Sequence, residues 1–97
     1  MKFTFHPAAE AEHLEHVAFY EGRQPGLGER YLRAFRSAME QVCQAPHRYK
    51  IERQPNLRRF RLQGFPFAVL YRETAGQVQV LAVPHLRQRP QYWVGRL

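Results

Sequence analysis

The sequence predicts an α+β domain in which a two-helix hairpin covers one face of an antiparallel sheet, in the order β-α-α-β-β-β. Apolar residues recur at helical spacing in two stretches before Pro46, and three short apolar runs separated by turn residues follow in 58–93. The length of 97 residues suits one domain, residues 1–97. A chain of this size buries roughly 60–65% of its unfolded surface, so we expect one modest core.

The N-terminal segment predicts a short strand followed by a helix. Residues 2–5 alternate, with Phe3 and Phe5 on one side. Pro7 favours a helix start because its φ is preset and no helical hydrogen bond is lost there. The helix is expected to run to about Glu21, with its histidines and most of its glutamates facing solvent. The apolar positions with helical spacing are Ala11, Leu14, Val17, Ala18 and Tyr20.

A second helix is predicted after the connection 22–28, which contains three glycines and one proline. It should run from about Leu27 to Ala45 and stop at Pro46, because proline cannot donate a helical hydrogen bond. The short connection predicts an antiparallel hairpin that lies on the sheet. The apolar positions again recur at three and four, at Tyr31, Ala34, Phe35, Ala38, Met39, Val42 and Ala45.

The remaining residues predict the sheet. A strand could start near Tyr49 or Ile51, before a turn at 54–56. A meander follows, with bends at 63–64 and 74–76. Its three apolar runs are Phe60–Leu62, Phe65–Tyr71 and Val78–Val83.

Basic residues outnumber acidic ones, and the excess lies in the second half of the chain. The formal net charge is +7, and there is no Asp. Residues 1–45 have a net charge of −1, whereas residues 46–97 carry ten cations and two acids, a net charge of +8. Such a surface attracts nucleic acid or an acidic protein. A solvated basic surface without a partner is the alternative.

The sequence offers no sign of export or of membrane insertion. No apolar run approaches the roughly 18–20 residues that a membrane helix needs, and the N-terminus lacks the apolar core of a secretory signal. The single Cys43 cannot form an internal disulfide, which suits a reducing compartment. We therefore expect a cytoplasmic protein without membrane contact.

Three features resemble sites but are better explained as structure. His13 and His16 have a spacing that zinc can use, but no third ligand is evident, so a solvated helix face is favoured. Cys43 shares core spacing with Met39 and Val42 and is interpreted as a small buried hydrophobe. The glycines of 22–28 lack the Lys-Ser/Thr pair of a phosphate-binding loop. We expect no metal and no cofactor.

The residue types also restrict the possible chemistry. A two-carboxylate or two-metal hydrolase is improbable because acids are scarce in the second half. Chemistry on RNA would need Arg to stabilise phosphorane charge and His or Tyr to move a proton. His85, Arg87, Arg89 and Tyr92 supply these types after the last predicted strand. Trp93 could stack on a base, although packing in the core is favoured.

The sequence resembles the RelE/ParE toxin superfamily of bacterial toxin–antitoxin modules, often labelled plasmid stabilisation proteins. The resemblance covers essentially the whole chain and includes the predicted helix hairpin. It implies the RelE/ParE-like fold and a toxin function. The matching pieces are Pro7-Ala8-Ala9, Pro46, Phe65-Pro66-Phe67, Tyr71, Val83-Pro84-His85, Arg89-Pro90 and Tyr92-Trp93.

The RelE-like branch cleaves mRNA on the ribosome, and this chain departs from it at two positions. The resemblance implies an arginine in the central strand, where Ala68 stands, and another after the last strand, where Leu86 stands. Only Tyr92 matches. Ala and Leu cannot stabilise phosphorane charge, so enzymatic activity is doubtful. A metal-independent endoribonuclease would have to use Arg61, His85, Arg87 and Tyr92.

The start of the second apolar run, Phe65–Phe67, and the ending H-x-x-x-R-P-x-Y-W look more like the ParE branch. ParE members bind and poison DNA gyrase, although Gln88 stands where an arginine is common in them. We therefore expect a ParE-like toxin that inhibits DNA gyrase by protein–protein binding. A ribosome-dependent mRNA interferase and a degenerate, non-toxic member are the alternatives.

The resemblance also implies a cognate antitoxin, which we expect to be acidic and partly disordered. Strand addition at an exposed sheet edge is one way in which it could bind. The residues expected to contact partners are Arg58, Arg59, Arg61, Arg72, His85, Arg87, Arg89, Tyr92 and Trp93.

Overall fold

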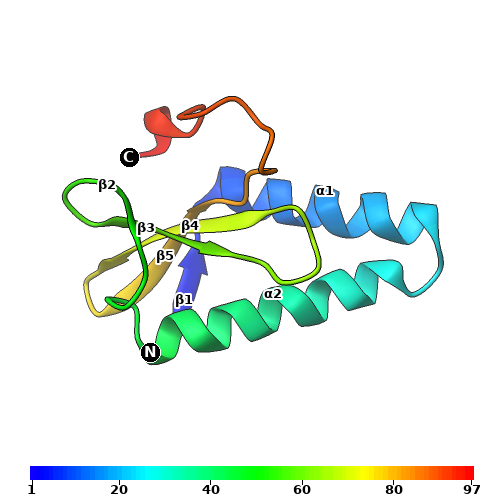
Figure 1. The fold of residues 1–97 in the computed structure, drawn as a ribbon, viewed down its shortest axis with the longest axis horizontal. Coiled ribbons are helices and arrows are strands. Elements are labelled where there is room, and N and C mark those ends of the chain that lie inside the picture. Colours follow the sequence, from blue (N-terminus) through cyan, green and yellow to red (C-terminus); the bar gives the residue numbers. More distant parts are fainter.

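The computed structural model describes all 97 residues, as one layer of two helices packed on one layer of five strands (Figure 1). The sheet order is β1-β5-β4-β3-β2. The C-terminal segment 84–97 turns back toward the start of α1 (Figure 1). The elements are β1 Phe3–Phe5, α1 Pro7–Arg23, α2 Leu27–Gln44, β2 Ile51–Arg53, β3 Leu57–Arg61, β4 Ala68–Thr74, β5 Gln77–Ala82 and the 3-10 turn η1 Val94–Arg96.

The α+β fold with a helix hairpin on one face of the sheet is confirmed, with two departures from the predicted antiparallel order β-α-α-β-β-β. Strands β2 to β5 pair antiparallel, but β1 pairs parallel with β5, placing Phe3 beside Val78. The sheet is therefore mixed rather than wholly antiparallel. A short β2 adds a fifth strand near Ile51. Alternation of side chains identifies a strand but carries no information about its direction or neighbour.

Helix α1 begins at Pro7 as expected, but its buried face differs from the predicted one. The His6 ring accepts a hydrogen bond from the Ala8 amide at 3.1 Å and caps the helix. Ala9 and His13 are buried, whereas Leu14 is 58% exposed. Val17 and Tyr20 of the predicted apolar face pack against the larger core cluster, whereas Ala11, Leu14 and Ala18 are exposed. The prediction is therefore wrong for these three positions, because histidines with hydrogen-bond partners point inward instead.

The prediction that His13 and His16 lie on a solvated face is also wrong. His13 Nδ1 lies 3.2 Å from the Tyr31 hydroxyl, and its ring packs 4.2 Å from the Phe35 ring centroid. His16 Nε2 hydrogen-bonds the Val83 carbonyl at 2.9 Å. Burial lowers the pKa of His13 to about 4, with a smaller contribution from His16. Both rings are therefore parts of the helix–sheet interface.

The connection between the helices is organised by Glu21. Its carboxylate accepts hydrogen bonds from the amides of Gly26 and Gly28 at 3.0 Å, which satisfies donors at the start of α2. Gly26 has φ of 89°, which favours glycine. A Cβ on Gly28 would lie 2.9 Å from the Val17 carbonyl oxygen, so only glycine permits this close approach of the helices.

The buried side chains form two clusters, one on each face of the sheet. The larger lies between the sheet and the helices and includes most of the predicted α2 positions, among them Tyr31, Phe35 and Met39. The Tyr71 side chain lies in this cluster, and its hydroxyl donates a hydrogen bond to the Pro46 carbonyl at 2.8 Å. Cys43 packs half-buried at its border, which raises the pKa of the thiol. The smaller cluster consists of Leu57, Leu70, Leu81, Ala82 and Trp93.

Neither helix is both long enough and apolar enough to cross a membrane.

Candidate functional site

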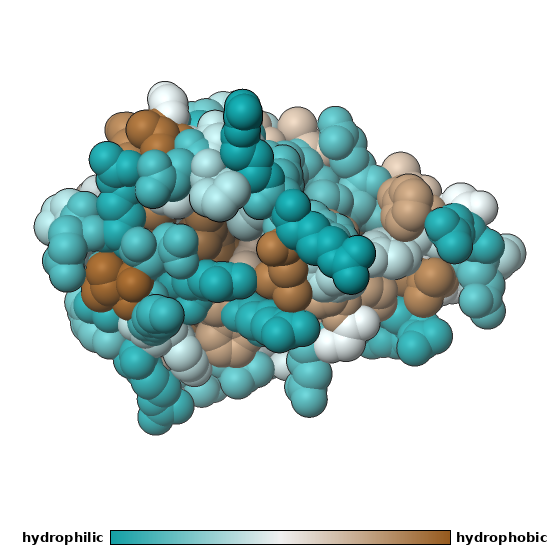
Figure 2. Space-filling model, turned by 45° about the horizontal axis from the view of Figure 1, so that its top comes forward, coloured by the Kyte–Doolittle hydropathy of each residue, from teal (hydrophilic) through white to brown (hydrophobic).

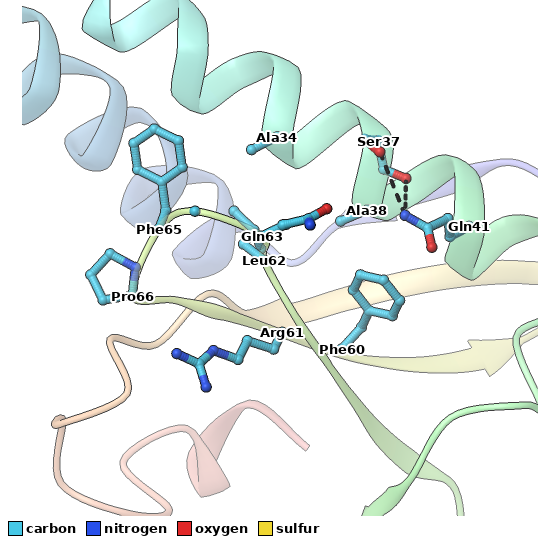
Figure 3. A pocket seen from close by; sticks show the side chains of 11 residues that line it. Ala34, Ser37, Ala38, Gln41, Phe60, Arg61, Leu62, Gln63, Phe65 and Pro66 are labelled. Atoms are coloured by element: carbon cyan, nitrogen blue, oxygen red, sulfur yellow. Dashed lines mark hydrogen bonds between the residues drawn. The ribbon is translucent and has the colours of Figure 1, made fainter.

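The sheet face that carries the smaller cluster is called the tail face here, because residues 84–97 pack on it. Side chains alternate along β3, and Leu57 belongs to the tail-face cluster whereas Phe60 packs toward the helices. Arg59 and Arg61 therefore project from the tail face, and Arg58 projects from the helix side. Figure 3 shows Arg61 and Phe60 on opposite sides of the strand.

Two of the predicted contact arginines are engaged within the chain. Arg58 Nη1 donates to the Tyr49 carbonyl at 2.7 Å, and Arg72 Nε donates to Gln79 Oε1 at 3.0 Å. Both are half-buried. Their charges are retained, but their hydrogen bonds already brace the sheet, so they are less available to a partner than an exposed arginine.

The exposed arginines of residues 46–97 are free of carboxylates. Of the ten cations in residues 46–97, only Arg96 lies within 4 Å of a carboxylate. Arg59, Arg61, Arg87 and Arg89 are all exposed and unpaired. Figure 2 shows the face with the C-terminal segment turned forward as mostly hydrophilic, with small separate apolar patches. This surface can attract an acidic partner electrostatically.

His85 marks the exit from the last strand and is held by local contacts. Its backbone bridges Phe67, and the two rings meet edge to face with 5.4 Å between centroids. Its Nδ1 accepts a hydrogen bond from the Arg87 amide at 3.0 Å, and its own amide donates to Gln88 Oε1 at 3.2 Å. These bonds fix the turn that presents Arg87 to solvent.

Trp93 and the Tyr92 hydroxyl are buried and do not belong to the exposed surface. Trp93 is only 4% exposed and belongs to the tail-face cluster, so it is a core residue and not a stacking platform. The Tyr92 hydroxyl is shielded from solvent beside Glu12 and Arg96. Burial raises the pKa of Tyr92 far above its usual value. A tyrosine in this state is a poor proton carrier near neutral pH.

A half-buried ion pair holds the C-terminal segment to α1. Arg96 Nη2 donates to Glu12 Oε2 at 2.8 Å, and Arg96 Nη1 donates to the Leu81 carbonyl at 3.1 Å. Glu12 Oε1 accepts from the Val83 amide at 3.0 Å. Burial disfavours the Glu12 charge, but the bonds from Arg96 and Val83 outweigh it and lower the pKa. Sequence reasoning missed this junction, since no local pattern links residues so far apart.

Two positions where the resemblance implies arginines in the RelE-like branch meet in one small hollow of the tail face. The hollow has a volume of about 150 Å³ and is lined in part by Ala68 and Leu86. Arg59 is the only arginine that lines it, and Glu52 lines it too with the opposite charge. Arg61, Arg87 and Tyr92 do not line it; of the predicted nuclease set only His85 does. The hollow thus lacks the convergent positive charge that phosphorane stabilisation requires.

The largest concave feature lies on the opposite side of β3 and was missed by sequence reasoning. It is a groove of about 830 Å³ between α2 and the β3–β4 connection (Figure 3). Phe60, Leu62 and Phe65 supply apolar surface from the strand side, and Arg61 is the only charged lining residue. Periodicity could not reveal the groove, because its residues lie on separate elements.

Comparison with known proteins gives a matching family model and a solved structure of similar fold. The family model described as "ParE toxin of type II toxin-antitoxin system, parDE" matches residues 3–90. A solved structure titled "Chromosomal ParDE TA system from P. aeruginosa" is similar in fold, with a TM-score of 0.64 and 21% sequence identity. The match covers 88% of this chain and 95% of that chain. No curated protein matches.

Proposed function

The chain belongs to the family of ParE toxins of type II toxin–antitoxin systems, and we propose that it acts by binding and inhibiting DNA gyrase. Inhibition by binding needs an accessible surface but no catalytic constellation. The exposed arginines Arg87 and Arg89, presented by the braced turn at His85, offer such a surface in the C-terminal segment. Gyrase acts on cytoplasmic DNA, so this target also places the toxin in the cytoplasm.

The hollow at Ala68 and Leu86 is the observation that carries the proposal. It lies where the RelE resemblance would locate RNA cleavage, yet it contains one arginine opposed by one glutamate. The shielded hydroxyl of Tyr92 removes the remaining matching residue from solvent. These features favour protein binding over catalysis.

A supercoiling assay with purified DNA gyrase tests the proposal. Excess wild-type protein should inhibit supercoiling, and induced expression should cause filamentation and DNA-damage induction. Reversing Arg87 and Arg89 to Glu should weaken inhibition by about tenfold or more, because two exposed cations become anions. Reversing Arg30 and Arg36, which are exposed on α2, is the matched control and should have little effect. Normal supercoiling with excess wild-type protein would refute gyrase as the target.

The alternative is a ribosome-dependent mRNA interferase, and mapping mRNA 5′ ends after induction distinguishes it. Codon-phased cuts that vanish on substitution of His85 would establish it, whereas unchanged 5′ ends would dismiss it. Unaffected growth together with normal supercoiling would indicate a degenerate, non-toxic member.

We also propose that the partner which neutralises the toxin is an acidic antitoxin. The absence of carboxylate partners for nine of the ten cations in residues 46–97 supports this assignment. Co-purification from the native operon followed by mass measurement would identify the partner and its stoichiometry. Finding no small acidic protein in the complex would contradict the proposal.

A further inference from the structure

The two edges of the sheet differ in how well they are protected against further strand pairing. Both edge strands, β1 and β2, have three residues. In β2, Glu52 and Arg53 are exposed charges and the pairing with β3 is irregular, and both features hinder the addition of another strand. Strand β1 consists of Phe3, Thr4 and Phe5, without a charge, a proline or an irregular register. It is therefore the edge that can accept a further strand.

The outer side of β1 carries backbone groups that β5 leaves unpaired. Strand β5 bonds the backbones of Lys2 and His6, with N···O distances of 3.0 and 2.8 Å. In a parallel pair, alternate residues of a strand bond to the same neighbour, so the backbone groups of Phe3 and Phe5 point away from β5. Each of these two residues thus offers an N–H and a C=O to a further strand.

Side chains beside this edge supply apolar surface for an interface. Phe3 is 37% exposed, although its ring meets the rings of Phe5 and Phe35 edge to face. Met1 is 54% exposed. Met1, Phe3 and Met39 help to line a hollow of about 320 Å³ between β1 and α2. A strand added at β1 would cover Phe3 and part of this hollow.

The charge near β1 permits the approach of a second copy of this chain, despite the formal net charge of +7. Residues 1–45 contain five cations and six acids, a net charge of −1, so the excess cations lie elsewhere. In the sheet order, β3 with its arginines is three strands away from β1, roughly 14 Å at the usual strand spacing. This exceeds the distance of about 8–10 Å over which salt screens exposed charges. Repulsion between two copies that meet at β1 is therefore weak.

We propose that two copies of this chain associate by antiparallel pairing of their β1 strands, which joins the two sheets into one. The sequence Phe3-Thr4-Phe5 reads the same in both directions, so a twofold axis at Thr4 places each Phe3 opposite Phe5 of the other copy. Each of these pairs exchanges two N–H···O bonds through the groups that β5 leaves free. Aromatic rings opposite each other, and threonine opposite threonine, are favourable cross-strand pairs.

The same register keeps like charges apart. Lys2 lies opposite His6 of the other copy, so the two lysines do not face each other. Pairing ends beyond these residues, because Pro7 has no N–H to donate and begins α1. The inference does not depend on the proposed gyrase target.

Sedimentation velocity of the full-length chain, from micromolar to near-millimolar concentration, measures this association. A short edge makes a small interface, so we expect weak, concentration-dependent dimers. Thr4→Lys and Thr4→Glu each place like charges opposite each other and should weaken self-association by about fivefold or more. An equimolar mixture of these two variants should restore dimers, because opposite charges then meet at the axis. Thr74→Lys and Thr74→Glu make the same changes at an exposed strand position away from this edge and should change the dissociation constant less than about twofold.

Hydrogen exchange followed by NMR tests the register without substitution. Protection of the Phe3 and Phe5 amides should increase as the concentration of the wild-type chain rises. A chain that stays monomeric over the whole range would overturn the inference, as would dimers that the Thr4 variants leave unchanged or that the Thr74 variants weaken equally. Protection of these amides only on addition of an acidic antitoxin would assign the edge to that partner and would also overturn it. Thermal melts establish whether the variants fold; if the Thr4 variants do not, amide exchange in the wild-type chain decides.

Discussion

Lowering the pH should destabilise the fold through His13 before any carboxylate is titrated. The ring is 7% exposed and is surrounded by Phe5, Tyr31 and Phe35, with His16 as the nearest titratable group on its own helix. Protonation would place a charge among these rings without an anion. The folded protein therefore resists protonation of His13, whereas the unfolded chain accepts a proton at the ordinary pKa of histidine.

The magnitude follows from the two pKa values. Burial lowers the pKa of His13 from 6.5 to about 4 in the folded protein. A depressed pKa gives stability that is fully present above pH 6.5 and is lost as the pH falls toward 4. Between pH 7 and pH 5 the free energy of unfolding should fall by about 2 kcal/mol, and the total loss by pH 4 should be about 3 kcal/mol.

Urea denaturation at half-unit steps from pH 7.5 to 4 measures this loss. The variant His13→Gln keeps a hydrogen-bonding group near Tyr31 but cannot be protonated, and it should lose most of the slope between pH 6.5 and 5. A free energy of unfolding that is flat over this interval in the wild type would refute the reasoning. An identical slope in wild type and variant would also refute it, since the slope would then arise elsewhere.

Three further perturbations test other contacts. In a double-mutant cycle measured by urea denaturation, Glu12→Gln and Arg96→Met together should lower the free energy of unfolding by less than the sum of the two single changes. The contact at 2.8 Å corresponds to about 6 kcal/mol of attraction at a dielectric constant near 20. Desolvation of the two charges offsets most of this, so we expect a coupling energy of about 1–2 kcal/mol. Additive costs would contradict a coupled pair. Gly28→Ala should destabilise by about 1–2 kcal/mol, because its Cβ would meet a backbone oxygen of α1 at 2.9 Å, whereas the control Gly22→Ala has open space and should be neutral or stabilising. Equal melting temperatures for these two variants would argue against the close approach. Tyr71→Phe removes a hydroxyl that donates to a buried carbonyl at 2.8 Å and should lower the free energy of unfolding by about 1–2 kcal/mol; no change would mean that the carbonyl finds water instead.

The fold was predictable wherever local pattern and burial coincide. Helix α2 shows this, since its apolar spacing named Tyr31, Phe35 and Val42, which are all buried. Helix α1 shows the limit, because the usual ranking of residues by polarity puts His13 outside. The Tyr31 hydroxyl, distant in the sequence, hydrogen-bonds the His13 ring and so offsets the cost of burying it.

The sequence predicted which residue types the candidate site contains, but not how the structure arranges them. The losses at Ala68 and Leu86 were visible in the sequence, and the structure brings both into one hollow. The separation of Arg58 from its neighbour Arg59 onto opposite faces follows from strand alternation once the strand is known. The groove on α2 and the bond between Glu12 and Arg96 could not be inferred, because each joins residues distant in sequence.

Strand β5 joins both ends of the chain, and this has a consequence for synthesis on the ribosome. The Val78 amide bonds the Lys2 carbonyl, the His6 amide bonds the Val80 carbonyl, and Arg96 reaches the Leu81 carbonyl. Strand β1 therefore cannot pair until β5 has been translated. At roughly 5–20 residues per second, this delays the pairing by several seconds. A product truncated before β5 would lack the strand that both termini require, so translation stalled at that point should release an unfolded and inactive chain.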